Sequence, residues 1–162
     1  MGALKEEGSG MECIEELMER LHSADNNEAY AAFKQLREAS AAGPEVAAHL
    51  GEFAGMLEAE SSYARTRSFL LLVANVRHDA EGRIDAAFDR MAACLHDPKP
   101  TVVRQCVQAL PELAAAKPVL TGRIIAALER IDPGDYRDSM QPLIAADASA
   151  ALAAVRDLQE RL

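Results

Sequence analysis

A spacing of 37 residues recurs along this chain and limits what it can fold into. The stretch from Asp97 to Ala116 is typical of a turn followed by a helix with one apolar face. Stepping back from it by this spacing, and then once more, gives three matching sets: Arg104, Val107 and Leu110; Arg67, Leu70 and Val73; Tyr30, Phe33 and Leu36. Each set follows a short polar turn and another helix-length apolar pattern. A period of this size with two helices per unit predicts an array of α-helical repeats.

The composition also favours helices. Aromatic residues make up 4% of the chain and Trp is absent, whereas Ala is abundant, which suits closely packed helices better than a sheet. The apolar periodicity predicts an all-α fold of about nine helices in roughly four pairs. The expected helices span 11–22, 26–40, 45–58, 62–76, 83–96, 100–116, 119–131, 136–146 and 147–160.

The key stretch carries a resemblance to a known family. From Asp97 to Leu110 it resembles the second half of a HEAT repeat, in which a turn Asp precedes a Val-Arg pair and then small and apolar residues. Here Asp97 and Arg104 are one residue further apart than the family usually has them. The chain is also similar to small bacterial HEAT-like proteins through SSYARTRSFLLLVANVRHDAEGRID and YRDSMQPLIAADASAAL. The resemblance covers roughly 11–147 and implies a right-handed α-α superhelix, a HEAT/armadillo-like solenoid.

We expect a flexible segment over residues 1–10 and one helical domain over 11–162. No apolar run approaches the roughly 20 residues that span a bilayer, and no signal peptide is visible, so we expect no membrane association. Three widely spaced cysteines indicate a reducing cytoplasm. They lack metal-binding spacing, and the four histidines lie near helix ends, so we expect neither a metal site nor a cofactor. Cys94 and Cys106 are candidates for neighbours in the core.

The net charge of −9 arises in the first third of the chain. Residues 1–60 contain 4 Lys or Arg against 13 Asp or Glu, and the remaining residues contain 13 of each. An acidic surface repels nucleic acid, so we expect no nucleic-acid partner.

The candidate binding residues are polar side chains on the second helix of each predicted pair, which lines the concave face of a HEAT array. They are Arg65, Arg67, Asn75, Arg104, Gln105 and Gln108. One interpretation is structural: Arg67 and Arg104 pair with turn acids, Glu60 and Asp97 being the natural partners. The other is functional: the strip grips an acidic segment of a partner.

No catalytic motif is present, so the sequence favours a non-enzymatic intracellular scaffold that binds a peptide or protein on its concave face. The alternative is an enzyme, because some HEAT-like proteins are DNA glycosylases. Those use a basic channel with aromatic residues beside a catalytic Asp, whereas this chain is acidic and lacks Trp. We expect a monomer or a weak homodimer that associates through the Ala-rich last helix.

Overall fold

The computed structural model describes residues 12–161, and every regular element in that range is helical. The all-α prediction is confirmed there, whereas the predicted flexible segment lies outside the described residues. The α-helices are α2 (Ile14–Leu21), α3 (Asn26–Ala42), α4 (Leu50–Met56), α5 (Ser62–Ala74), α6 (Arg83–Ala93), α7 (Pro100–Ala116), α8 (Thr121–Glu129) and α9 (Gln141–Glu160). Short 3₁₀ turns flank them at Glu45–His49, Val76–His78, Cys94–His96, Pro118–Leu120 and Pro133–Asp135.

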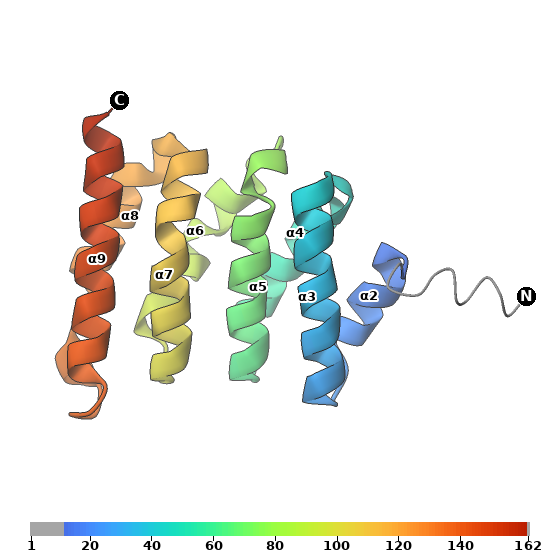
Figure 1. Cartoon of the computed structure of the whole chain (residues 1–162), viewed down its shortest axis with the longest axis horizontal. Coiled ribbons are helices and arrows are strands. Elements are labelled where there is room, and N and C mark those ends of the chain that lie inside the picture. The colour runs from blue at the N-terminus through green and yellow to red at the C-terminus, as the bar shows by residue number, and fades with distance from the viewer. Residues whose placement is uncertain (1–11, 162) are drawn as a thin grey trace, which may run out of the picture.

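The helices form two layers. Figure 1 shows α3, α5, α7 and α9 side by side in chain order, all running in the same direction, with the shorter α2, α4, α6 and α8 in a second layer. Each long helix contacts the next long helix along the row. In the second layer, α4 contacts α6. The N-terminal ends of the long helices therefore lie at one edge of the row.

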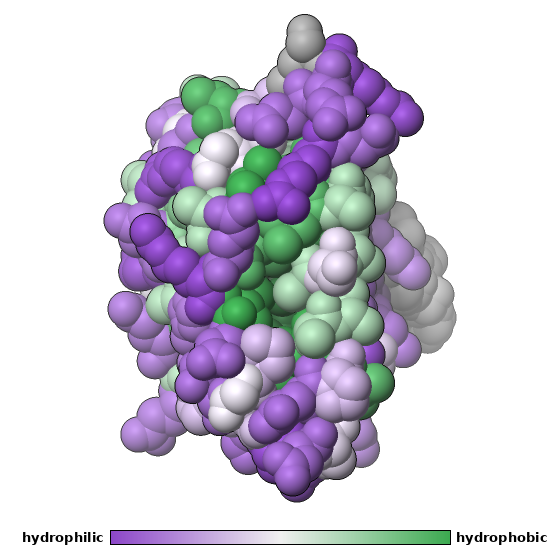
Figure 2. Space-filling model, turned by 90° about the vertical axis from the view of Figure 1, so that its left-hand side faces the viewer, coloured by the Kyte–Doolittle hydropathy of each residue, from purple (hydrophilic) through white to green (hydrophobic). Residues whose placement is uncertain are grey.

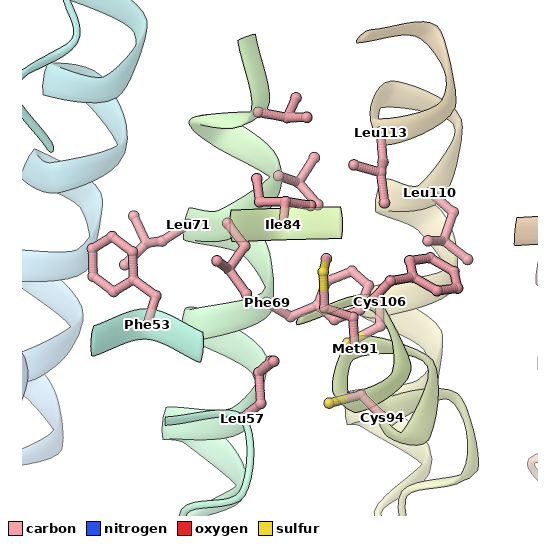
Figure 3. Packing of buried hydrophobic residues seen from close by; sticks show 14 of the residues in the cluster. Phe53, Leu57, Phe69, Leu71, Ile84, Met91, Cys94, Cys106, Leu110 and Leu113 are labelled. Atoms are coloured by element: carbon pink, nitrogen blue, oxygen red, sulfur yellow. The ribbon is translucent and has the colours of Figure 1, made fainter. Parts of the chain in front are cut away.

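The core fills the space between the two layers. Figure 3 shows Phe53 of α4, Ile84 and Met91 of α6, and Phe69 of α5 directed into one shared apolar cluster. The spacing of 37 residues holds there, because Ala32, Phe69 and Cys106 are all 0% exposed. The helices α3, α5 and α7 thus present the same face to the short helices behind them.

The expected count of about nine helices is wrong, because the described residues form eight α-helices. The difference arises at the C-terminal end. The segments predicted as 136–146 and 147–160 join into one helix, α9. Pro142 lies in the first turn of α9, where a missing N–H costs nothing. Asp147 therefore lies inside α9 and does not begin a helix, and its carboxylate accepts a hydrogen bond from Arg104 of α7.

Candidate functional site

The six residues of the predicted strip do not lie together. Arg67 and Gln105 line one groove on the long-helix row, and Gln108 is exposed further along α7. Arg65, Asn75 and Arg104 instead make polar contacts between neighbouring elements.

Arg65 binds the carboxylate of Asp97 through two parallel hydrogen bonds. Its Nε lies 2.6 Å from Oδ2 and its Nη2 lies 2.9 Å from Oδ1. Nη1 also donates to the carbonyls of Ala59 and Glu60. The hydrogen bonds that Arg65 donates to Asp97 raise the pKa of Arg65, although burial opposes this. Arg65 therefore ties the start of α5 to the turn before α7.

Arg104 pairs with an acid on the next helix of the row. Its Nε lies 2.6 Å from Oδ2 of Asp147, and this hydrogen bond raises the pKa of Arg104. The expected partner, Asp97, is wrong because that carboxylate is taken by Arg65. Arg104 thus connects α7 to α9.

Asn75 is fully buried where α5 ends. Its Nδ2 donates to Oγ of Ser40 at 2.9 Å and to the carbonyl of Leu71 at 2.8 Å. Ser40 in turn donates to the carbonyl of Leu36. This chain of hydrogen bonds joins α5 to α3, so a ligand on the surface does not reach Asn75.

Arg67 differs from the other two arginines because its charge has no acidic partner. Its Nη2 donates to Oδ1 of Asn26 at 2.8 Å, and no carboxylate of the described residues forms an ion pair with it. Its guanidinium carbon lies over the rings of Tyr30 and Tyr63, at 5.4 and 5.2 Å from their centroids. Burial lowers the pKa of Arg67, which is only 9% exposed. The predicted pairing of Arg67 with Glu60 is wrong. Glu60 makes a hydrogen bond only through its backbone carbonyl, which accepts from Arg65.

Arg67 lies in a groove across α3, α5 and α7 with a cavity of about 500 Å³. We call it the α3–α5–α7 groove. It combines apolar surface with hydroxyl and amide groups, and its lining residues are Asn26, Tyr30, Phe33, Ser62, Tyr63, Thr66, Arg67, Leu70, Thr101, Val102 and Gln105. Tyr30 and Tyr63 are 47% and 58% exposed, which places two large rings at the groove surface.

Sequence reasoning missed part of this groove. Tyr30 and Leu70 both belong to the matching sets that repeat at the spacing of 37 residues, but Tyr30 is exposed and Leu70 is half-buried. The spacing of 37 residues did carry a signal, because it relates Tyr30 to Arg67 and Asn26 to Tyr63. Arg67 lies over the ring of Tyr30, and Asn26 and Tyr63 line the same groove, because equivalent positions on adjacent long helices lie side by side.

A second surface of interest is the α9 end of the row. Figure 2 views this end and shows an apolar strip down its middle, bordered by hydrophilic residues. Leu143 of α9 is 41% exposed, and much of the remaining outer surface of α9 is alanine. No further helix of the described chain covers this face.

Residues 12–161 also bear on metal binding and on membrane insertion. No group of three or more His, Cys, Asp or Glu side chains is placed to hold a metal ion. None of the described helices is long and apolar enough to cross a membrane. The thiols of Cys94 and Cys106 do interact, and this contact together with burial raises the pKa of Cys106 above its usual range.

Comparisons with protein-family models, with curated proteins and with solved structures gave no match to this chain.

Proposed function

We propose that this chain is a HEAT-like array, a right-handed α-α superhelix that acts as a non-enzymatic scaffold for a peptide or protein segment. The row of long helices would be the concave side of that superhelix. The spacing of 37 residues supports the proposal, as do the chain-order arrangement of the helices and the polar ties between neighbours. Its three free cysteines suit a reducing intracellular compartment.

The observation that carries the proposed binding role is the pair of exposed tyrosines in the α3–α5–α7 groove. Tyrosine offers a large rigid ring and a hydroxyl, and it is enriched where proteins bind partners. The groove crosses three helices and offers apolar side chains such as the half-buried Leu70 beside amides such as Gln105. A peptide could lay side chains on the first and hydrogen-bond to the second.

A peptide selection tests this function directly. Random peptides are selected on the full chain, and their Kd is measured for wild type, for Tyr63→Asp and for Val119→Asp. Val119 is the matched control because it is also an exposed apolar residue, at 77%, on a turn that does not line the groove. We expect Tyr63→Asp to weaken binding at least ~10-fold, about 1.4 kcal/mol, and Val119→Asp to leave it unchanged. Failure to select any peptide, or equal binding to all three proteins, would contradict the proposed function.

The apolar α9 end favours a second, weaker association between two copies of the chain. A pair of end faces that meet would cover Leu143, which is otherwise exposed. Sedimentation equilibrium over a range of concentrations tests this. We expect a weak dimer in wild type and a monomer for Leu143→Asp. A wild-type monomer at every concentration would contradict self-association through α9 and would not affect the proposed peptide binding by the groove.

A further inference from the structure

The α3–α5–α7 groove is a positive site on an acidic protein. The chain carries a net charge of −9, yet the described residues that line the groove include Arg67 and no Asp or Glu. The nearest cap carboxylate, Asp25, lies outside the lining and accepts a hydrogen bond from the backbone N–H of Asn27 at 3.0 Å. The charge of Arg67 is therefore not neutralised by the groove itself.

Arg67 also has unused hydrogen-bonding capacity. A guanidinium carries five N–H donors, and within residues 12–161 only one contact to a side-chain oxygen is made, from Nη2 to Asn26. Arg67 is 9% exposed, but none of its nitrogen atoms is both buried and without a hydrogen-bond partner, so the unused donors are open to the groove. A largely buried cation without an opposite charge is costly, and a bound anion would reduce that cost.

The neighbours of Arg67 hold it in a defined position. The rings of Tyr30 and Tyr63 attract the cation, and Asn26 fixes one end of the guanidinium. A side chain held in this way loses little further freedom when a ligand binds, which favours affinity.

The helices add to the positive potential. α3, α5 and α7 begin at Asn26, Ser62 and Pro100, and the groove is lined by Asn26, Ser62 and Thr101 from these first turns. Figure 1 shows these three ends at the same edge of the row. Helix N-termini carry partial positive charge, so three of them together reinforce the attraction of Arg67 for an anion.

From these observations we infer that the groove binds the carboxylate of an Asp or Glu side chain on the partner peptide, with Arg67 donating two parallel hydrogen bonds to it. This inference rests on the proposed function, whose ligand it makes more specific. A planar carboxylate matches the fork of one guanidinium. A phosphate carries a charge of about −1.5 to −2 at neutral pH and is commonly held by clusters of arginines, whereas Arg67 is the one cation in the described lining.

Nuclear magnetic resonance of the arginine Nε–H groups tests the inference on the intact chain. The probes are three small blocked amino acids: N-acetyl-glutamate N-methylamide, its glutamine analogue and its phosphoserine analogue. We expect the glutamate probe to shift the Nε–H signal of Arg67 with saturation near a Kd of about 1 mM, a realistic strength for one ion pair on so small a ligand. The glutamine probe should leave the signal in place.

Variants identify the residue that binds. Arg67→Lys keeps the charge but loses the fork, and it should weaken binding of the glutamate probe about tenfold. Because this variant has no Nε–H at position 67, the Kd of every variant is measured from the backbone amide signals of the groove residues. The matched control is Arg123→Lys, because Arg123 also lies over an aromatic ring, that of Phe88 at 4.8 Å, outside the groove. This control should bind as wild type does. Since the first experiment uses wild-type protein, loss of folding in a variant would not prevent a result.

Several results would overturn the inference. Equal shifts with the glutamate and glutamine probes would show that charge is not recognised, and tighter binding of the phosphoserine probe would make phosphate the ligand. The absence of any shift at Arg67 would remove the anion site even if selected peptides bind the groove, so the proposed function would stand alone. Conversely, a shift at Arg67 without any selected peptide would support the carboxylate site and contradict the peptide scaffold.

Discussion

Asp97 joins parts of the chain that lie far apart in the sequence. Its carboxylate accepts two hydrogen bonds from Arg65, and its backbone carbonyl accepts one from the hydroxyl of Tyr136 at 2.8 Å. The Asp97 side chain is 4% exposed and that of Arg65 is 16% exposed, so water screens the pair only weakly. The same carboxylate receives the backbone N–H of Lys99, which shapes the turn before α7.

A double-mutant cycle measures this contact. We expect Asp97→Asn and Arg65→Gln each to lower the free energy of unfolding by about 3 kcal/mol, because each leaves a largely buried charge without its partner. The double variant should lose clearly less than the sum. Urea unfolding gives all three values. Asp97→Asn combined with Arg104→Gln serves as the control and should be additive, since Arg104 pairs with Asp147. Additive effects of Asp97→Asn and Arg65→Gln would refute the coupling.

Single residues show where sequence reasoning reached its limit. The period picked out Arg67 and Arg104 as polar residues on the long helices, and both are there. It did not identify their partners, because Asp147 lies 43 residues beyond Arg104, at the start of a segment predicted as a separate helix. The ion-pair partner of an arginine depends on which side chains meet between neighbouring helices. A shift of one helix by a single residue relative to its neighbour changes which side chains meet.

At the scale of one element, α6 depends on a carboxylate before its first turn. Asp79 accepts hydrogen bonds from the backbone N–H groups of Arg83 and Ile84, each at 2.8 Å, and from Nζ of Lys117 at 2.9 Å. Burial alone would raise the pKa of Asp79, but the hydrogen bonds from Lys117 and the two backbone groups outweigh it and lower the pKa below 3.8. The stabilisation is therefore complete above about pH 4 and is lost as the pH falls through the lower folded-state value.

Asp79→Asn should remove part of this acid sensitivity. We expect it to lower the free energy of unfolding at pH 7 by about 1–2 kcal/mol and to flatten the loss of stability below pH 4. Chemical unfolding at a series of pH values measures both effects. Asp89→Asn is the control, because Asp89 also pairs with an arginine but its side chain is 93% exposed. An unchanged slope in Asp79→Asn would show that other carboxylates cause the acid loss.

Two glycines should respond oppositely to alanine. A Cβ at Gly55, within α4, meets nothing within 4 Å, so Gly55→Ala should stabilise by about 0.5–1 kcal/mol. Gly82 precedes α6 with φ at +72°, a conformation that costs other residues about 1–2 kcal/mol, so Gly82→Ala should destabilise. Thermal melts of both variants check the signs. A lower melting temperature for Gly55→Ala would mean that α4 needs the flexibility of glycine.

Most helices follow from the sequence because apolar periodicity and turn residues agree along them. The exception is α9, because Pro142 and Asp147 are each compatible with two local structures. Proline is tolerated in the first turn of a helix and disrupts its interior, while aspartate either caps a helix or forms an ion pair with a neighbouring helix. Only the position of α7 beside α9 selects the second role for Asp147.

At the scale of the whole molecule, the recurring spacing predicted which helices are equivalent, and the long-helix row in Figure 1 has them side by side. It did not predict the groove, because a groove depends on which side chains are left uncovered. Tyr30 and Phe33 are three residues apart on one helix, yet one is exposed and the other is 4% exposed. The difference arises from the position of α5 against α3, which no pattern within α3 contains.

Stability should also vary along the row. α2 lies at one end and has its principal contacts with α3 alone, whereas α5 contacts α3, α4 and α7. Leu17 of α2 and Leu71 of α5 are both buried, at 3% and 0% exposure, so each Leu→Ala change removes a similar apolar contact, worth about 2–5 kcal/mol.

Native-state hydrogen exchange should nevertheless distinguish the effects of the two Leu→Ala changes. We expect Leu17→Ala to speed exchange in α2 while the helices beyond α3 keep their protection, because an end helix can open without its distant neighbours. Leu71→Ala should speed exchange in α3, α4, α5 and α7 together, since α5 packs directly against the other three. Equal acceleration throughout the chain by Leu17→Ala would instead mean that α2 unfolds only with the whole array.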